Sequence, residues 1–236
     1  MMPGMDNKPL RIDVWSDVVC PWCWIGKHRL DRAVQGMGPV EIRWHPFLLD
    51  PEADATPVPL REAYAAKFGS PERVAQVLGQ TQATARAEGL PMDFDRGQVR
   101  VSTLDAHRVA WLAGHAGADP LAVGEALFRA HFEHGRNLAD PQVLADAGEA
   151  GGLPRERTLA MLASDEGKAE VRGALMQAQQ LGIRAVPTFV LDGRLAVQGA
   201  QSPEVFRQAF AQVGRVPIAQ FDTGAADACG PDGCAV

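Results

Sequence analysis

The sequence contains no long apolar run and no cluster of positive charge. No segment reaches the roughly 18 consecutive apolar residues that a membrane-spanning helix requires, and the opening MMPGMDNKPLRIDVWSDV lacks the apolar core of a secretory signal. The net charge is -6, and no run of Lys or Arg offers a local attraction for phosphate groups or anionic lipid. We therefore expect neither nucleic acid nor membrane as a partner, and we expect a cytoplasmic location.

Cysteine is scarce as well, with four residues in a chain of 236. A reducing cytosol does not sustain structural disulfides, so paired cysteines there are more often catalytic, redox-sensing or metal-binding. The remaining composition, 46% hydrophobic and 22% charged, is typical of a globular protein long enough to bury a full core. The cysteines are therefore the first candidates for chemistry.

The N-terminal part has the pattern of a strand, a helix and a second strand. Residues 11–17, RIDVWSD, are rich in β-forming side chains, and the segment after Pro21 contains no helix breaker until Gly36. Residues 40–47, VEIRWHPF, begin with apolar and polar side chains in alternation. This order predicts a parallel strand pair joined by a right-handed crossover.

Helical patterns dominate the middle of the chain, between about Pro59 and Leu181, and no convincing strand interrupts them. Three helix starts combine a capping side chain with a proline at the first helical position: Ser70-Pro71, Asp119-Pro120 and Asp140-Pro141.

Strand patterns appear again near the C-terminal end of the chain. Residues 188–191 and 195–197 flank Asp192-Gly193, which favours a hairpin turn, and a last helix follows Ser202-Pro203.

The complete order is β-α-β, a helical block, then α-β-β-α, which indicates an α/β protein with a thioredoxin-like fold interrupted by an all-helical insertion. We expect residues 9–58 and 182–218 to form a discontinuous thioredoxin-like domain. Residues 59–181 are the expected insertion domain, with the helix 168–181 at the junction. Residues 219–236 are rich in Gly, Ala and Asp and are expected to form a flexible tail that carries the second cysteine pair.

The segment Cys20-Pro21-Trp22-Cys23 places two thiols one helical turn apart, where the first strand meets the first helix. A thiol attacks only as a thiolate, and a helix N-terminus stabilises negative charge through its unpaired N–H groups and its dipole. Pro21 suits the first helical position, so we predict that Cys20 is an exposed nucleophile at the start of the helix. Cys23 is expected to be more buried and to resolve the mixed disulfide.

The dipeptide Val186-Pro187 immediately precedes the late strand, where a trans proline would be unusual in a central strand. In a thioredoxin-like context we predict a cis bond there, although only about 5–6% of X-Pro bonds in folded proteins are cis. We expect this bond to turn a backbone edge toward the active site, where a substrate peptide can pair as an added strand. Trp22, Val186 and Pro187 are therefore the predicted substrate-binding residues.

Four segments closely resemble FrnE-type members of the DsbA family: SDVVCPWCWIGKHRL, TLDAHRVAWLA, LFRAHFEHGRNLADPQVL and GIRAVPTFVLDGRLAVQGAQSP. The resemblance implies a thioredoxin domain with a helical insertion, and protein thiol-disulfide oxidoreductase or isomerase activity. It implies the redox pair at Cys20 and Cys23 and the cis-proline at Pro187. The periplasmic oxidase DsbA has His before its second cysteine, whereas this chain has Trp22, so the resemblance does not imply strong oxidase behaviour.

A second pair, Cys229 and Cys234, is separated by the turn-forming residues Gly-Pro-Asp-Gly. We expect a secondary redox pair that exchanges with Cys20, and the alternative is two surface thiols with no coupled role. A zinc site built from both pairs is disfavoured, because the pairs are much further apart in sequence than in compact zinc modules. His131 and His134 are expected near a helix end rather than on a metal, so we predict no metal site and no cofactor.

The leading hypothesis is a thiol-disulfide oxidoreductase or disulfide isomerase. Its expected partners are protein or peptide thiols and disulfides, with a small-thiol or thioredoxin-type system for recycling. One alternative is a glutathione-dependent isomerase or transferase of the 2-hydroxychromene-2-carboxylate isomerase or kappa type; these share the architecture but typically carry a single Ser nucleophile. A second alternative is a thiol-based redox or zinc sensor. The cysteine pair favours the first hypothesis and leaves the direction of electron flow open.

Overall fold

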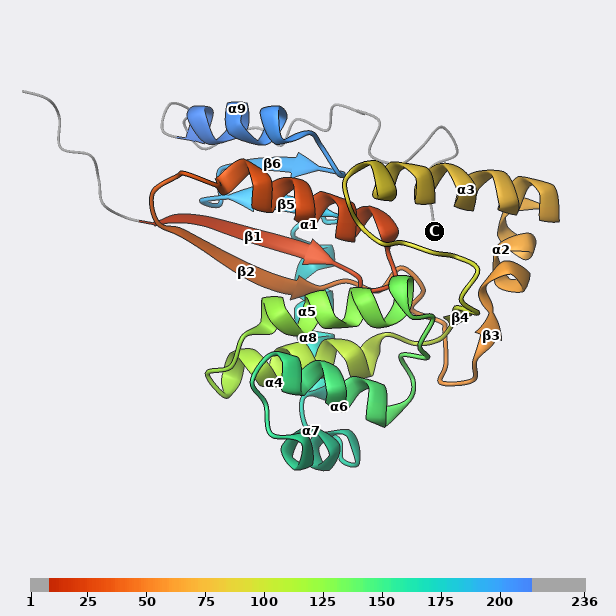
Figure 1. The fold of residues 1–236 in the computed structure, drawn as a ribbon. Coiled ribbons are helices and arrows are strands. Elements are labelled where there is room, and N and C mark those ends of the chain that lie inside the picture. The colour runs from red at the N-terminus through yellow and green to blue at the C-terminus, as the bar shows by residue number, and fades with distance from the viewer. Residues whose placement is uncertain (1–8, 214–236) are drawn as a thin grey trace, which may run out of the picture.

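The computed structural model describes residues 9–213, and its main sheet has four strands in the order β2-β1-β5-β6. β1 (Leu10–Ser16) pairs in parallel with β2 (Val40–Pro46) and antiparallel with β5 (Thr188–Leu191). β6 (Leu195–Gln198) completes the sheet, antiparallel to β5. Strands from both ends of the described chain therefore lie side by side, as the sequence order predicts (Figure 1).

The crossover helix α1 (Pro21–Val34) begins at its proline and buries one face. The buried residues of this face are Cys23, Trp24, Ile25, Gly26, Leu30 and Ala33. Gly26 permits a close approach, because a Cβ atom at this position would lie 3.0 Å from Cγ of Pro187. The helix that carries the cysteines is therefore packed directly against the residue that precedes β5.

The last helix, α9 (Pro203–Val213), packs beside α1 on the same side of the sheet (Figure 1). The ring of Phe206 meets the ring of Phe189 edge-on, with 4.9 Å between centroids. Val205, in the first turn of this helix, is 38% exposed. Between β5 and β6, Asp192 and Gly193 have φ values of 50° and 68°, so the chain turns where the Asp-Gly pattern predicts.

The helical block lies between β2 and β5 and occupies the lower and right-hand parts of Figure 1. The predicted caps are present: the side chains of Ser70, Asp119 and Asp140 each accept a hydrogen bond from a backbone N–H of the following helix. The helices are α2 (Leu60–Phe68), α3 (Pro71–Ala87), α4 (Leu104–His115), α5 (Pro120–Phe128), η1 (Arg129–Glu133), α6 (Pro141–Ala150), α7 (Arg155–Leu162) and α8 (Lys168–Gln180).

The block departs from the regular α-helical composition expected from the sequence in two places. β3 (Val58–Pro59) and β4 (Val99–Arg100) form a small antiparallel sheet at the base of α2. Two-residue strands are too short to leave an alternating pattern in the sequence. A second departure is η1, a single π-helical turn that continues α5, and such turns are frequent at functional sites.

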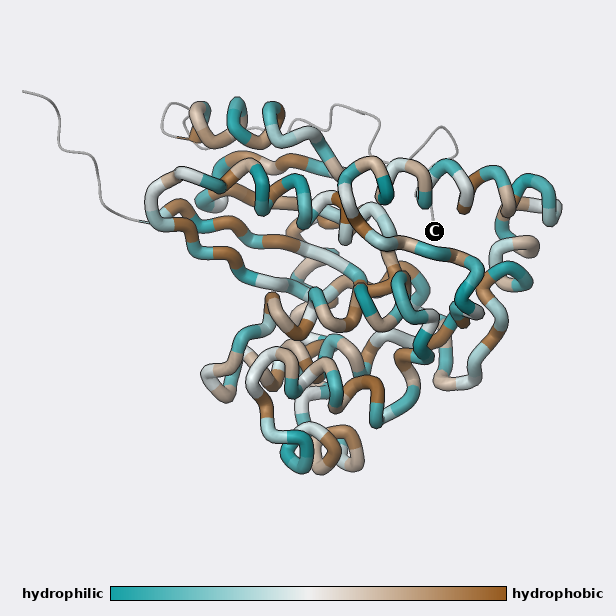
Figure 2. Tube along the Cα trace, in the orientation of Figure 1, coloured by the Kyte–Doolittle hydropathy of each residue, from teal (hydrophilic) through white to brown (hydrophobic). Residues whose placement is uncertain are grey.

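Apolar side chains are concentrated in the interior, and Figure 2 shows brown segments alternating with teal along the strands. One cluster of buried residues joins the two cysteines to α2, α3 and η1. In this cluster, the Trp24 ring stacks on Phe128 and Phe132 at centroid distances of 6.0 and 5.9 Å.

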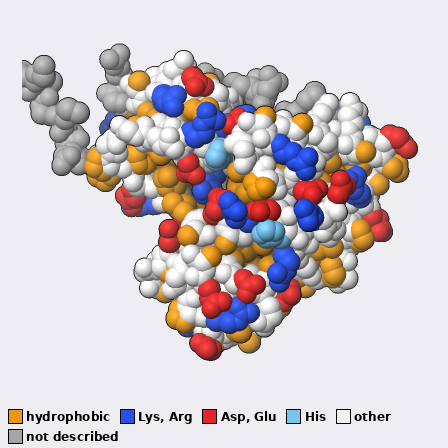
Figure 3. All heavy atoms as spheres, in the orientation of Figure 1, with side chains coloured by type: hydrophobic (Ala, Val, Ile, Leu, Met, Phe, Trp, Pro, Cys, Tyr) orange, Lys and Arg blue, Asp and Glu red, His pale blue; other side chains and the backbone are white. Residues whose placement is uncertain are grey.

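None of the described helices is long and apolar enough to cross a membrane. On the face drawn in Figure 3, acidic and basic side chains are intermixed.

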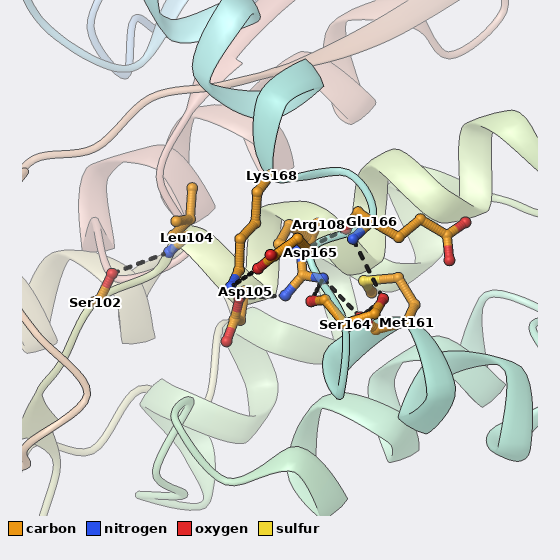
Figure 4. A network of polar contacts seen from close by, with 9 residues as sticks. All are labelled: Ser102, Leu104, Asp105, Arg108, Met161, Ser164, Asp165, Glu166 and Lys168. Atoms are coloured by element: carbon orange, nitrogen blue, oxygen red, sulfur yellow. Dashed lines mark hydrogen bonds and ion pairs between the residues drawn. The ribbon is translucent and has the colours of Figure 1, made fainter.

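A fully buried arginine joins α4 to the segment between α7 and α8 (Figure 4). The guanidinium of Arg108 donates hydrogen bonds to the carbonyl oxygens of Met161, Ser164 and Glu166 at 2.6–2.8 Å, and to Asp105 at 2.8 Å. These acceptors satisfy a charge that would otherwise be costly to bury. The start of α8, the helix that leads back to the sheet, is fixed in this way.

Candidate active site

Cys20 lies at the N-terminus of α1 and has an extended backbone conformation, with φ -90° and ψ 112°. Its carbonyl oxygen accepts hydrogen bonds from the N–H groups of Cys23 and Trp24, at 3.1 and 3.4 Å, so the helix begins at this residue. Pro21 occupies the first helical position, where a backbone N–H would have no partner within the helix, so the missing N–H of proline costs nothing. Cys20 and Cys23 are both free thiols, one turn apart.

The loop before β5 faces the same thiols. The peptide bond between Val186 and Pro187 is cis, in agreement with the prediction from the sequence. The Sγ of Cys20 lies 4.0 Å from the carbonyl oxygen of Val186, to which the protonated thiol donates a weak hydrogen bond. The carbonyl oxygen of Pro187 accepts a hydrogen bond from Gly199 at 2.7 Å, which fixes this loop to the end of β6.

Burial of the two cysteines differs from the expectation. Cys20 is 1% exposed and Cys23 is 2% exposed, so Cys20 is not an exposed residue and Cys23 is not the more buried one. The difference between them lies in access to a cavity. Cys20 lines a cavity of about 760 Å³ together with its neighbours Pro21 and Trp22, whereas Cys23 is absent from its walls.

The electrostatic surroundings of the two thiols also differ, as the pKa of Cys23 shows. Burial raises the pKa of Cys23 well above its ordinary value, and a hydrogen bond to Cys20 and the negative charge of Cys20 raise it further. The hydroxyl of Ser16 and the backbone of Asp17 lower it by less. Cys23 therefore keeps its proton at neutral pH, as expected for a resolving thiol. This proton is available for a hydrogen bond to the Cys20 sulfur.

The cavity is built mainly by the helical block. Its walls come from α2, α3, the β3–β4 sheet, η1 and the segment Cys20-Pro21-Trp22. Most of the lining side chains are apolar: Val19, Pro21, Trp22, Leu49, Val58, Leu60, Ala63, Ala66, Phe68, Val77, Leu78, Phe94, Val99 and Val101. Its volume lies within the range of roughly 300–1,000 Å³ that is typical of ligand sites.

The polar residues of the cavity wall were not identified as site residues from the sequence, and two of them, Tyr64 and His131, have altered pKa values. Tyr64, the only tyrosine of the chain, has its pKa raised to about 12 by burial and by the charges of Cys20 and Asp17. His131 belongs to η1, and burial lowers its pKa to about 4, so its imidazole is neutral at pH 7. Its Nδ1 atom has no hydrogen-bond partner. The sequence gives no signal that joins either residue to Cys20.

A buried carboxylate lies behind the cysteines. Asp17 is 1% exposed, and its Oδ2 accepts a hydrogen bond from the N–H of Leu49 at 2.8 Å. Its Oδ1 lies 3.4 Å from Nε2 of His107, which donates to the carbonyl oxygen of Phe47 at 2.9 Å. His107 is therefore a packed and hydrogen-bonded helix residue, as its position in α4 suggests.

The structure places the cysteine pair, Cys20 and Cys23, beside the predicted substrate-binding residues. Trp22 is half-buried in the cavity wall, and Val186 faces Cys20. Cys229 and Cys234 lie outside the described residues. Among residues 9–213, no group of three or more His, Cys, Asp or Glu side chains is arranged to hold a metal ion.

Comparison with known proteins agrees with this geometry. A family model described as DSBA-like thioredoxin domain matches residues 11–211. The chain is 37% identical to a solved structure described as a probable DsbA oxidoreductase, SCO1869 from Streptomyces coelicolor, with a TM-score of 0.81 over 96% of this chain and 99% of that one. It is 28% identical to YwbO of Bacillus subtilis, covering 85% of this chain and 95% of YwbO.

A more distant solved structure is the cytosolic disulfide reductase DsbM from Pseudomonas aeruginosa. It is 22% identical, with a TM-score of 0.61, and the match covers 87% of this chain and 99% of DsbM. At this identity the likeness concerns the fold.

Proposed function

Because the chain belongs to the DSBA-like thioredoxin domain family, we propose that it exchanges thiols and disulfides with protein or peptide substrates through Cys20 and Cys23. The observation that carries this proposal is the position of the Cys20 thiol. It lies at the N-terminus of α1, in the wall of a cavity, and 4.0 Å from the Val186 carbonyl oxygen. A helix N-terminus favours the thiolate form that exchange requires.

The exchange proceeds in two steps. The Cys20 thiolate attacks one sulfur of the substrate disulfide, so that a Cys20–substrate bond forms and the second substrate sulfur leaves as a thiolate, which takes a proton from water. Cys23 then attacks Cys20, which releases the first substrate sulfur and leaves a Cys20–Cys23 disulfide. Two electrons have passed to the substrate, and a small thiol or a thioredoxin-type partner returns them.

Isomerisation follows from the same mixed disulfide. If a free thiol of the substrate attacks the bond before Cys23 does, the substrate disulfides are rearranged and Cys20 is regenerated without net electron transfer. The relative rates of the two attacks decide between reduction and isomerisation. Burial still raises the pKa of Cys23 in the mixed disulfide, which slows its attack and favours rearrangement within the substrate.

The contacts of Cys23 also set the order of events. The hydrogen bond and the charge of Cys20 raise the pKa of Cys23, and both are removed when Cys20 becomes part of a mixed disulfide. Cys23 is then deprotonated more easily than in the free enzyme. The resolving thiol thus becomes more reactive only after a substrate has been captured.

We also propose a cytoplasmic location and an exchange between the first pair and Cys229–Cys234. A reducing compartment would keep the first pair as the free dithiol that attacks substrate. The second pair would take up or supply the two electrons of each cycle. Mass mapping of disulfides trapped during turnover tests this exchange, and a tail pair that stays in one redox state throughout would refute it.

Cys20 and Cys23 variants test the proposed reaction directly. Cys20→Ser should lose insulin reduction and refolding of scrambled protein, because no thiolate remains at the cavity. Cys23→Ser should accumulate a mixed disulfide with substrate, because the resolving thiol is missing. The double variant Cys229→Ser/Cys234→Ser is the matched control and should still form and resolve mixed disulfides. Undiminished turnover by Cys20→Ser would refute the proposal.

A further inference from the structure

Arg29, on α1, contacts both the helical block and the turn that follows β6. Its side chain is 19% exposed, so the guanidinium is largely enclosed by protein. Nε and Nη2 lie 2.8 and 2.7 Å from Oε1 of Glu88, at the C-terminal end of α3. Nη1 donates to the carbonyl oxygen of Ala200 at 2.5 Å. One planar cation therefore joins three segments that are distant in the sequence.

The turn that Arg29 holds is attached to the loop with the cis peptide bond. Gly199, immediately before Ala200, donates its N–H to the carbonyl oxygen of Pro187 at 2.7 Å. A rigid peptide bond joins Gly199 to Ala200, so a displacement of Ala200 moves the donor of this hydrogen bond as well. The contact between Arg29 and Ala200 therefore acts on the loop through a single intervening residue.

The same turn packs against α1 at Gly26, which lies on the same face of the helix as Arg29. A Cβ atom at Gly26 would lie 3.0 Å from Cγ of Pro187 and 3.4 Å from Cα of Ala200. This close packing resists movement of the proline ring and the turn toward α1. The charge-assisted hydrogen bond from Arg29 resists movement away from it. Together the two contacts fix the distance between α1 and the loop.

This distance matters at the reactive thiol. The loop reaches Cys20 through Val186, whose carbonyl oxygen lies 4.0 Å from the Cys20 Sγ. The backbone of the same loop is the edge on which we expect a substrate peptide to pair. A peptide that reacts with Cys20 must contact the loop and α1 at once, and a misplacement of about 1 Å can cost on the order of 100-fold in rate.

We propose that Arg29 is a positioning residue for peptide substrates, which holds the turn after β6, and through it the cis-proline loop, at the distance from Cys20 that a bound peptide requires. The inference rests on the proposed function and adds a residue to it. The covalent step is unchanged: the substrate disulfide breaks, a Cys20–substrate bond forms, and the second substrate sulfur leaves as a thiolate. A small disulfide requires only the sulfur of Cys20 and does not depend on the loop.

The test compares a peptide disulfide with a small disulfide. The rate of mixed-disulfide formation is measured in a Cys23→Ser/Cys229→Ser/Cys234→Ser background. One substrate is a linear peptide whose single cysteine is disulfide-bonded to cysteamine, and the other is bis(2-hydroxyethyl) disulfide. Arg29→Met should slow the peptide reaction at least about tenfold and leave the rate of the small disulfide within about threefold. The ratio of the two rates cancels any change in the reactivity of Cys20 itself.

Three further variants separate this role from the attachment of α3. Glu88→Gln removes the ion pairs of Glu88 but leaves the hydrogen bond from Arg29 to Ala200, so it should keep the rate ratio of the background. Arg32→Met removes a side chain that pairs only with Glu88, and it should keep the ratio as well. Arg29→Lys retains the charge beside Glu88 but not the planar fork that reaches Ala200 at the same time, so it should lose the ratio as Arg29→Met does.

Hydrogen exchange at the Gly199 amide reports on the loop directly. This amide donates to the carbonyl oxygen of Pro187. Its exchange should be faster in Arg29→Met and Arg29→Lys than in Glu88→Gln, because only the first two variants release the turn.

The outcomes separate this inference from the proposed function. An unchanged rate ratio in Arg29→Met, or in Arg29→Lys should Arg29→Met fail to fold, would overturn the positioning role, while reaction at Cys20 would stand. An equal loss of the ratio in Glu88→Gln would also overturn it, because the effect would then belong to the attachment of α3. If neither disulfide forms a Cys20 adduct in the background itself, the proposed function is wrong.

Discussion

Cys20 and Cys23 have nearly the same exposed fraction, 1% and 2%, but different chemical surroundings. One lines a cavity, and the other is enclosed by side chains and has its pKa raised, first by burial and then by its partner. Two buried polar residues lie behind them: Oδ1 of Asp17 has no hydrogen-bond partner, and the hydroxyl of Ser16 lowers the pKa of Cys23. Reactivity at this site is therefore decided by neighbours and not by exposure alone.

Removing the Cys20 thiol should make Cys23 easier to deprotonate. In Cys20→Ala, the hydrogen bond and the charge that raise the pKa of Cys23 are both absent, whereas burial remains. Thiolate absorbance measured against pH, in a Cys229→Ser/Cys234→Ser background, should show Cys23 titrating at lower pH than in the same background with Cys20 present. Unchanged titration would mean that burial alone determines the pKa of Cys23.

His131 should make stability depend on pH. Its pKa is about 4 in the folded protein and 6.5 for the ordinary group, so between these values the unfolded chain binds more protons and the free energy of unfolding falls as pH decreases. From pH 7 to pH 5, the parent should lose about 2 kcal/mol more than His131→Leu in urea denaturation. His134→Leu, at an exposed position three residues later, should keep the pH dependence of the parent. Equal slopes for the parent and His131→Leu would contradict this account.

At the scale of elements, α2 and α3 form much of the cavity wall, and α3 is attached to α1 by ion pairs. Glu88, at the C-terminal end of α3, accepts from Arg29 and Arg32 of α1, each at 2.7 Å. Arg29 also donates to the carbonyl oxygen of Ala200 at 2.5 Å. These contacts fix the distance between the wall of the cavity and the helix that begins at Cys20.

Loss of this attachment should loosen α3. Glu88→Gln should lower the free energy of unfolding by about 2 kcal/mol, because two guanidinium groups lose a partner that is only 16% exposed. Hydrogen exchange in α3 should become faster. The control Glu204→Gln removes an exposed ion pair with Arg207 at 3.4 Å and should cost clearly less than Glu88→Gln. A similar cost for both variants would show that Glu88 does not act as an attachment point.

At the scale of the whole molecule, the two ends of the described chain form the sheet. After the helical block, the chain must return to the sheet so that β5 pairs with β1 in the correct register. We propose that residues 59–181 are an insertion in a thioredoxin-like domain formed by residues 9–58 and 182–218, of which 214–218 lie beyond the described residues. The buried Arg108 network holds the α7–α8 segment against α4, at the point where this return begins (Figure 4).

Arg108→Leu should therefore destabilise the whole protein. The substitution leaves the carbonyl oxygens of Met161, Ser164 and Glu166 without this donor in a buried site, so the free energy of unfolding should fall by about 3–5 kcal/mol. Arg157→Leu removes an arginine that also contacts Glu166 but is 40% exposed, and it should cost about 1 kcal/mol or less. Urea denaturation measures both variants, and comparable losses would contradict a special role for the buried network.

The sequence by itself determined the order of the elements that form the main sheet and the position of the cysteine pair, but not the β3–β4 sheet or η1. Alternation in residues 40–47, proline-capped helix starts and the Asp-Gly turn are local signals, and each depends on backbone preferences that act over a few residues. The spacing of Cys20 and Cys23 and the proline at position 187 belong to the same class. They required no knowledge of distant contacts.

Only the tertiary structure decided the burial of Cys20, the cavity and the partners of the cysteines. Tyr64 and His131 come from elements far from Cys20 in the sequence, and packing of the helical block brings them to the same cavity. Their altered pKa values arise from desolvation, which depends on everything packed around a group. Local patterns fix where a side chain sits along an element, whereas the environment that sets its chemistry is assembled from distant segments.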